Sequence, residues 1–430
     1  MEPIGRNNFL ELTYNIRGTN SEMDKRTFRK DNSGTNDYTV IDTAYTRLVK
    51  NDFLNQNISL NFRSMRKNFN YMIGVGIEPS STKTEITDPK MEEKIIPRKN
   101  YLNFAPRARF HYNWDKRHNL RVDYRGSAES PTAQQLYDGI ISQNGFNVTT
   151  GNPNLRPSFE NRVDIRYQKF NPEKASSMIL FGRFTHTSND IVTVSKYDGP
   201  SRITSYDNIN GNWNGNLRFI FNFPLKNKKF SINSMSFGSY EKSNTLINNR
   251  NSVDPQKNRA NIYRLRENMG LRFTSDLLEF NVRGNISYYS VNNSISTNSN
   301  KNTYDYGGYF DFTLNLPYDF RIDSDITYST NSGYGEGFNR NEWLWNASIS
   351  KDIFKAKNGT IRFKIYDILQ ERSNISRSIS SESIQDSRTN TISSYFMFNF
   401  VYRFQIFKGG AKASDMRGPE GPPHRRGMRM

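Results

Sequence analysis

The sequence predicts an all-β protein, specifically a transmembrane antiparallel up-and-down β-barrel. Three observations favour this fold. Apolar and polar side chains alternate along almost the whole chain, short connections alternate strictly with long ones, and no run of about 18 apolar residues occurs that could form a transmembrane helix. A protein of this kind that lies in a membrane crosses it with strands.

The composition is polar but rich in aromatic side chains. Only 34% of the 430 residues are hydrophobic and the mean hydropathy is -0.82, yet 30 Phe and 24 Tyr are present. Disordered chains are poor in aromatic residues, so we expect a folded protein. The net charge of +18 favours an acidic partner, which could be nucleic acid, an anionic lipid surface or an anionic solute. The absence of cysteine excludes disulfides and thiolate metal sites.

Apolar side chains that recur at every second position predict sixteen strands. The clearest case is the stretch 320–328, in which Phe320 and Ile322 share one face while Arg321 and Asp323 share the other. The predicted strands centre on residues 10–16, 58–62, 71–77, 102–112, 120–124, 162–167, 178–184, 217–223, 230–232, 269–273, 280–288, 310–316, 320–328, 343–349, 361–365 and 392–406.

Seven short connections interleave with eight long ones. The short connections lie near residues 65–68, 113–118, 171–174, 224–229, 275–276, 317–319 and 355–359, and the long ones near residues 18–50, 79–98, 127–158, 187–202, 240–260, 289–302, 329–341 and 371–390. Tight turns at one end and large loops at the other are typical of outer-membrane barrels. A soluble β-sandwich or propeller fits less well, because the polar face is too rich in Arg and Asp for a dry core.

The long polar stretch after the fifth predicted strand contains a motif in which two prolines bracket three residues. Proline fixes its own φ, so the pair steers the chain out of the third long loop and into the sixth strand at a set angle. We therefore interpret the motif as structural, leading the chain into a strand. Its residues are Gly151, Asn152, Pro153, Asn154, Leu155 and Pro157.

Several short motifs together resemble the barrel of TonB-dependent receptors. They are Tyr124-Arg125, Ser130-Pro131-Thr132, Gln135-Leu136, and the motif at 151–157 followed by an Asn-led strand. Near the end, the stretches 365–370, 395–398 and 402–404 resemble the close of the branch called the outer-membrane-protein β-barrel family. The resemblance covers about residues 8–406.

This resemblance implies a location in the cell outer membrane, contact with its lipid and lipopolysaccharide, and no enzymatic activity. Such receptors are typically 22-stranded barrels with a plug, a TonB box and a signal peptide. They import a large scarce solute, such as a metal chelate, a vitamin or a glycan. No stretch here is assignable as plug, TonB box or signal, so we expect the sixteen strands to be the C-terminal portion of a wider barrel. Closure with a porin-like lumen is the alternative for the fold. For the function, the alternative is a barrel that does not import and acts in adhesion or assembly through its long loops.

Arginines recur on the polar face of the predicted strands. On one interpretation they line the lumen and bind a plug or an anionic solute. On the other they pair with Asp123, Asp164, Asp311, Asp323 and Asp325, as a wet lumen requires in any case. Their spread over many strands argues against nucleic acid, which would need a clustered stripe. The predicted lumen-lining residues are Arg107, Arg109, Arg121, Arg125, Arg162, Arg166, Arg321 and Arg403.

The sequence predicts no catalytic, cofactor or metal site. Residues 31–37 carry oxygen ligands that could hold calcium, but they lack a spaced bidentate Glu and fit a solvated loop better. His186 near Asp190 is the weak pattern for a hydrolase. Trp114, Tyr318, Trp343 and Trp345 are expected in interfacial girdles. We expect residues 1–407 to form the barrel domain and the basic, Gly/Pro-rich residues 408–430 a disordered tail.

Overall fold

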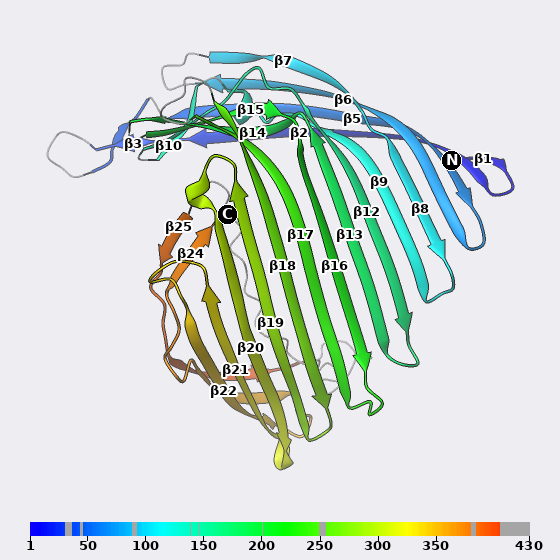
Figure 1. Cartoon of the computed structure of the whole chain (residues 1–430), viewed down its shortest axis with the longest axis vertical. Coiled ribbons are helices and arrows are strands. Elements are labelled where there is room, and N and C mark those ends of the chain that lie inside the picture. The colour runs from blue at the N-terminus through cyan, green and yellow to red at the C-terminus, as the bar shows by residue number, and fades with distance from the viewer. Residues whose placement is uncertain are drawn as a thin grey trace.

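The computed structural model describes residues 1–404, apart from residues 31–36, 44–45, 88–92, 138, 145, 200, 249–254 and 380–383. Its main element is one continuous, largely antiparallel sheet (Figure 1). The strands of its wall are β2 (Asn8–Lys25), β5 (Arg47–Met65), β6 (Phe69–Thr87), β7 (Glu93–Phe104), β8 (Arg107–Asn113), β9 (His118–Glu129), β12 (Ser158–Asn171), β13 (Ser176–Ser188), β16 (Asn212–Pro224), β17 (Phe230–Asn248), β18 (Gln256–Thr274), β19 (Leu278–Asn293), β20 (Lys301–Leu316), β21 (Phe320–Ser332), β22 (Asn341–Ile353), β23 (Gly359–Tyr366) and β26 (Tyr395–Tyr402).

Each wall strand pairs with the next in the chain, which confirms the predicted up-and-down order. β7 and β8 both pair with β6, on either side of the break at Ala105 and Pro106, so together they act as one strand. Counted this way, the described wall has the sixteen predicted strands. All of the wall pairings are antiparallel, as expected for strands joined by short turns and loops.

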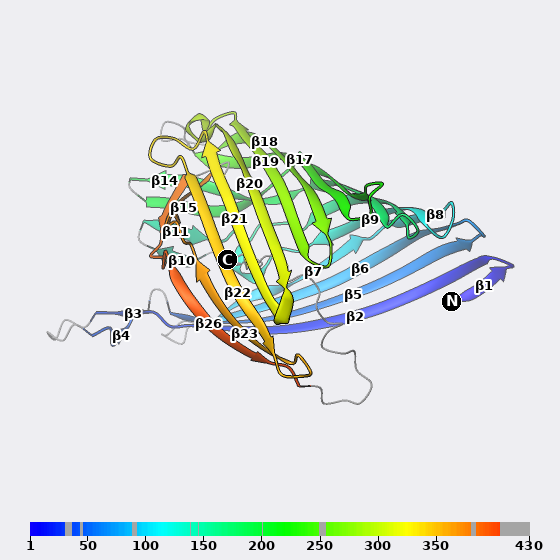
Figure 2. The ribbon, with the colours of Figure 1, turned by 90° about the horizontal axis from the view of Figure 1, so that it is seen from below.

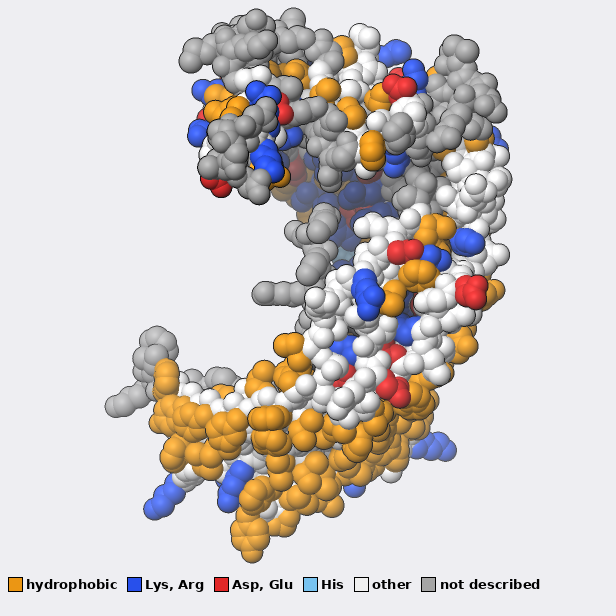
Figure 3. All heavy atoms as spheres, turned by 90° about the vertical axis from the view of Figure 1, so that its left-hand side faces the viewer, with side chains coloured by type: hydrophobic (Ala, Val, Ile, Leu, Met, Phe, Trp, Pro, Cys, Tyr) orange, Lys and Arg blue, Asp and Glu red, His pale blue; other side chains and the backbone are white. Residues whose placement is uncertain are grey.

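The two faces of the sheet differ in chemistry as the alternation predicts. Outward side chains such as Leu12 and Leu102 each expose 71% of their surface. A hydrophobic layer covers the outside of the lower part of the wall in Figure 3, and Lys and Arg side chains lie inside the hollow. Such apolar exposure would be unfavourable in water, whereas it is favourable against lipid.

Aromatic rings gather near both ends of the wall strands. At the short-turn end Trp114 contacts Tyr112 and Tyr167, with ring centroids 4.8 and 6.0 Å apart. At the other end Trp213 packs on Tyr240 at 4.7 Å. Two such belts are typical of a β-sheet that spans a bilayer.

The connections sort by end, as predicted, but their lengths differ from the prediction. The short turns lie along the lower and right-hand edge of Figure 1, and the longer connections lie at the upper left. Most of the expected loop at 79–98 is strand, because β6 continues to Thr87 and β7 begins at Glu93. The expected loop at 187–202 is largely hairpin β14 (Asp190–Asp198) and β15 (Ser201–Ile209). Cross-strand pairing beyond the wall extends these strands, and local sequence does not report it.

Smaller elements decorate the long-loop end. They are α1 (Ala133–Leu136), β10 (Ile140–Asn144) and β11 (Asn147–Thr150) in the third loop, β3 (Phe28–Arg29) and β4 (Val40–Ile41) in the first, and β24 (Ile375–Ile379) and β25 (Ile384–Arg388) in the last. The remaining elements are β1 (Glu2–Gly5), which pairs with β2, and the 3-10 turns η1 (Thr297–Ser299) and η2 (Pro317–Asp319). No helix among the described residues is long and apolar enough to span a membrane.

The sheet curls around a hollow but stays open. Figure 2 shows it arching from β2 to β26, and Figure 3 shows the gap as a C-shaped outline. Within the described residues no pairing joins β1 or β2 to β26. The two edge strands therefore present unpaired backbone groups.

Candidate lumenal binding wall

The inner face of the strands from β8 to β16 carries a dense set of arginines, which we call the basic wall. The pairing register places them in rows across neighbouring strands. Arg107, Arg125 and Arg162 stand directly opposite one another on β8, β9 and β12. The full set is Arg107, Arg109, Arg121, Arg125, Arg162, Arg166, Arg183 and Arg218.

Two aspartates of the basic wall are each held by two arginines. Asp123 accepts from Arg109 Nε at 2.7 Å and from Arg121 Nε at 2.5 Å. Asp164 accepts from Arg162 Nε at 3.1 Å and from Arg183 Nε at 2.6 Å. Charge-assisted bonds of this kind orient the guanidinium groups within a wet lumen. Four of the arginines are thus paired with acidic side chains.

The other four arginines of the basic wall have no carboxylate within ion-pair distance in the described part of the chain. Arg107 donates to Asn57 Oδ1 at 3.4 Å, and Arg166 donates to Gln168 Oε1 at 3.2 Å. Both partners are neutral, and like charges directly opposite each other destabilise a sheet. The basic wall therefore carries excess positive charge that an anion would offset.

The remaining predicted lumen residues lie elsewhere. Arg321 is on the inner face of β21, 3.5 Å from Asp323, whose carboxylate also accepts from Thr313 Oγ1 at 2.8 Å. Arg403 lies just beyond β26, where its backbone N–H bonds to Asn358 and its Nη1 donates to Thr360 Oγ1 at 3.2 Å. The structure does not bring these two residues into the basic wall.

The motif at 151–157 lies where three segments of the long-loop end meet. Asn152 Nδ2 donates to the carbonyl of Tyr206 at 2.9 Å, and the Pro157 carbonyl accepts from Asn189 Nδ2 at 2.8 Å. Leu155 is only 3% exposed. Pro153 and Asn154 form the exposed turn between them, and the Asn154 N–H bonds to the Asn152 side chain. The motif thus ties its loop to the β14–β15 hairpin, and its role in leading the chain into β12 stays a prediction.

The last two long loops fold together at the same end of the wall. Arg377 makes a two-point contact with Asp386 at 2.6 and 2.8 Å and donates to the Tyr334 carbonyl at 2.7 Å. The hydrogen bond from Arg377 lowers the pKa of the Asp386 carboxyl. Burial raises the pKa of Tyr334 to about 12, and its hydroxyl donates to Asp305 at 2.7 Å. The β24–β25 hairpin also places Ile379 on the inner apolar cluster of Ala260, Ile262 and Val291.

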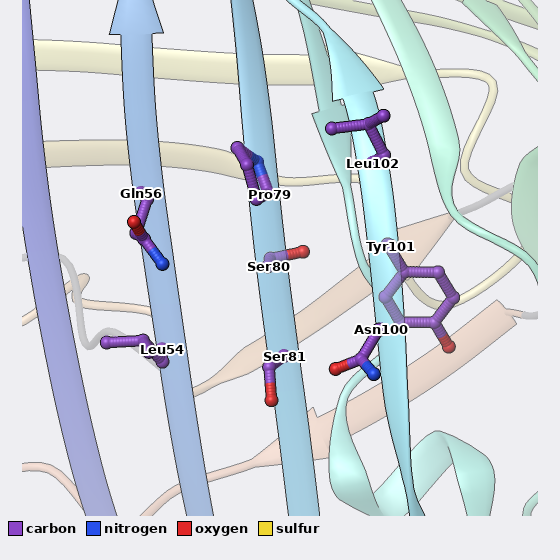
Figure 4. A pocket seen from close by; sticks show the side chains of 8 residues that line it. All are labelled: Leu54, Gln56, Pro79, Ser80, Ser81, Asn100, Tyr101 and Leu102. Carbon is purple, nitrogen blue, oxygen red and sulfur yellow. The ribbon is translucent and has the colours of Figure 1, made fainter.

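A shallow pocket of about 360 Å³ lies on the extended parts of β5, β6 and β7 (Figure 4). Leu54, Pro79 and Leu102 line it with polar neighbours. No group of metal-ligating side chains occurs among the described residues. Most of the candidate calcium loop, residues 31–36, lies outside them. Asp190, the candidate partner of His186, accepts from Asn212 Nδ2 at 2.7 Å.

A curled sheet that is apolar outside and charged inside defines the wall of a transmembrane β-barrel. The chain belongs to the outer membrane protein β-barrel family, whose model matches residues 2–277 and 257–402. Its location is accordingly the cell outer membrane. No curated protein matches the chain.

Three solved structures resemble the chain at low sequence identity. The copper transporter OprC is 10% identical with a TM-score of 0.45, covering 92% of this chain and 64% of its own. The ferric citrate transporter FecA in the unliganded form is 9% identical with a TM-score of 0.24, covering 93% and 79%. The beta domain of the Bordetella autotransporter Brka is 10% identical with a TM-score of 0.18, covering 79% and 99%. The chain therefore spans 64% of the length of the first of these.

Proposed function

We propose that the chain is the barrel portion of an outer-membrane receptor that takes up a large scarce solute with energy supplied through TonB. The solute class is a metal chelate, a vitamin or a glycan. The observation that carries the proposal is the basic wall. Among the described residues, four of its arginines have no carboxylate within ion-pair distance, and an anionic solute or a plug would supply one. The partners are a plug domain, the TonB system and, on the outer face, lipid and lipopolysaccharide.

We also propose that further strands complete the barrel. In the hydrocarbon of a bilayer each unsatisfied backbone group costs several kcal/mol, so the free edges of β2 and β26 have to be paired. They could pair with each other or with additional strands. The open outline of the sheet favours additional strands, and hence a barrel wider than sixteen strands.

Engineered cysteine pairs test this arrangement, and only they would react with a thiol cross-linker, since the chain contains no cysteine. Leu12→Cys with Phe398→Cys spans the two edges, whereas Leu12→Cys with Leu60→Cys joins direct partners on β2 and β5. We expect a short thiol cross-linker to join the second pair in outer membranes and to leave the first pair unlinked. Efficient linking of Leu12→Cys to Phe398→Cys would show that the sheet closes on itself.

Uptake is tested in the cell. A strain that lacks the protein is grown with an iron chelate, cobalamin or an oligosaccharide as the limiting nutrient. We expect slower growth on one of these, restored by the wild-type gene and abolished again by a protonophore or by loss of TonB. Normal growth on all of them, with the protein abundant in the wild-type outer membrane, would contradict an import function.

The contacts among the long loops favour a second candidate, a barrel that serves adhesion or assembly without import. Asn152 and Tyr206 join two loops, and Arg377 and Tyr334 join two more, which gives the exposed end a defined surface. This function predicts that the deletion strain loses surface attachment or outer-membrane integrity while its growth on every limiting nutrient is unchanged.

A further inference from the structure

One row of the inner face alternates arginine with phenylalanine, and we call it the Arg/Phe row. Pairing places Arg166 of β12 opposite Phe181 of β13, and Phe181 opposite Arg218 of β16. Arg218 stands opposite Phe237 of β17, which stands opposite Arg266 of β18. Five neighbouring strands thus contribute one residue each, over about 20 Å at the usual strand spacing.

The two phenylalanines break the polar pattern of the inner face. Lumen-facing positions of such barrels are normally polar, because they meet water. Here the ring of Phe181 lies beneath the Arg183 guanidinium at 5.5 Å, and that of Phe237 beneath the Arg218 guanidinium at 5.8 Å. The next inner row towards the short turns is also apolar, with Ile179, Ile220 and Met235 in register. Apolar side chains therefore border the Arg/Phe row on the side of the short turns.

The three arginines of this row make no ion pair among the described residues. Arg166 donates to Gln168 Oε1 at 3.2 Å and Arg266 Nε to Ser287 Oγ at 3.1 Å, both neutral acceptors. Among the described residues, no carboxylate lies within ion-pair distance of these two arginines or of Arg218. Successive arginines are two strands apart, about 10 Å, with one phenylalanine between them. A ligand with an aromatic ring flanked by anionic groups matches that spacing. The ligand ring can stack on the phenylalanine ring while its anionic groups contact the guanidinium groups.

We propose that the Arg/Phe row is a lumenal binding site for solutes that combine planar aromatic rings with carboxylates or similar anions. The proposal rests on the uptake function, since it names the substrate class that the barrel would admit. An aliphatic polyanion would use the arginines alone. A neutral aromatic solute would use the rings alone. The row recognises the combination.

Calorimetry with two matched probes tests the site on the purified protein, together with the strands that complete its barrel, in lipid nanodiscs. Benzene-1,3,5-tricarboxylate and propane-1,2,3-tricarboxylate carry the same number of carboxylates, but only the first has a ring. We expect the aromatic probe to bind about tenfold more tightly at low ionic strength, the size of effect expected from ring stacking with cation–π contact. Arg218→Gln should weaken both probes about tenfold, since it removes a charge-assisted contact.

Substitutions at Phe237 test how much the aromatic ring contributes to binding, separately from the arginine charge. Phe237→Leu should remove the preference for the aromatic probe, and Phe237→Tyr, which keeps a ring, should retain it. Phe219→Leu on the outer face of β16 is the matched control for the ring, and Arg321→Gln on β21 is the control for charge outside the row. Both controls should leave the two affinities unchanged, and heat-dependent gel mobility verifies that each variant is folded.

Equal affinities for the two probes would overturn the proposal, as would absence of binding or an unchanged preference in Phe237→Leu. So would a loss in Arg321→Gln as large as that in Arg218→Gln. A different result would refute the uptake function. Probe binding that persists in a protein without any import phenotype would refute uptake alone, whereas import without probe preference would refute the row alone.

Discussion

Replacing Gly151 with alanine is expected to lower the amount of folded protein in the outer membrane several-fold. A Cβ at this position would overlap the carbonyl oxygen of Tyr137 and would lie 2.7 Å from the carbonyl oxygens of Gln134 and Gln135. These are backbone atoms of α1 and of its C-cap Tyr137, and the Thr132 and Gln135 capping box holds the first turn of this helix. They cannot move without disrupting the loop, and such overpacking typically costs about 1–3 kcal/mol.

The level of heat-modifiable protein in isolated outer membranes measures the effect of Gly151→Ala. Gly284→Ala in β19 is the control, because a Cβ there would meet nothing within 4 Å. Pro157 substitution should act in the same direction as Gly151→Ala, because it would remove the ring that fixes φ directly before β12. Near-normal levels with altered solute selectivity would identify the motif as a ligand loop instead of an assembly element.

Val282→Arg is expected to destabilise the membrane-inserted protein by about 2–4 kcal/mol, the cost of an Arg near the bilayer midplane on a barrel strand. Val282 lies on the outer face of β19 and is 46% exposed. Its neighbour Asn281 points inward, where its Nδ2 donates to Asp311 Oδ1 at 2.9 Å. Asn281→Arg places the same charge beside an acceptor in the lumen, so we expect it to change stability by less than about 1 kcal/mol.

Equilibrium unfolding by guanidinium chloride in phospholipid vesicles compares the two variants. The pair is matched for the residue introduced and for depth in the wall, and differs only in the face of the sheet. Equal costs, or a larger cost for Asn281→Arg, would show that the assignment of outer and inner faces is wrong.

The sequence alone determined the number of strands, the face of each side chain and the end of the wall at which each connection lies. The period of a strand is two, so residues such as Phe320 and Arg321 report their faces without knowledge of any partner strand. The alternation of short and long connections is also read locally, although the structure turns much of the expected loops at 79–98 and 187–202 into strand. The structure confirms even the weak strand predicted at 230–232 and extends it to Asn248.

Only the tertiary structure decided which side chains meet. Register depends on pairing between separate strands, and a slip of one residue would turn every side chain of a strand to the other face. The opposition of Arg107, Arg125 and Arg162 therefore follows from pairing, as does the alignment of Phe181 and Phe237 with the arginines between them. Phe181 stands at the polar parity of β13, which is the one sequence signal that could have singled it out.

The docking of the long loops has no local signature in the sequence, and the expectation of a sheet that does not close by itself comes from the family resemblance. The contact of Arg377 with the Tyr334 carbonyl joins residues 43 positions apart, and no local pattern encodes such a distance. Closure of a barrel depends on strand tilt and stagger summed over the whole sheet, so the separation of β2 and β26 has no local signature either. Local periodicity determines the strands and their faces, whereas the geometry accumulated across sixteen strands determines the lumen and the residues that meet inside it.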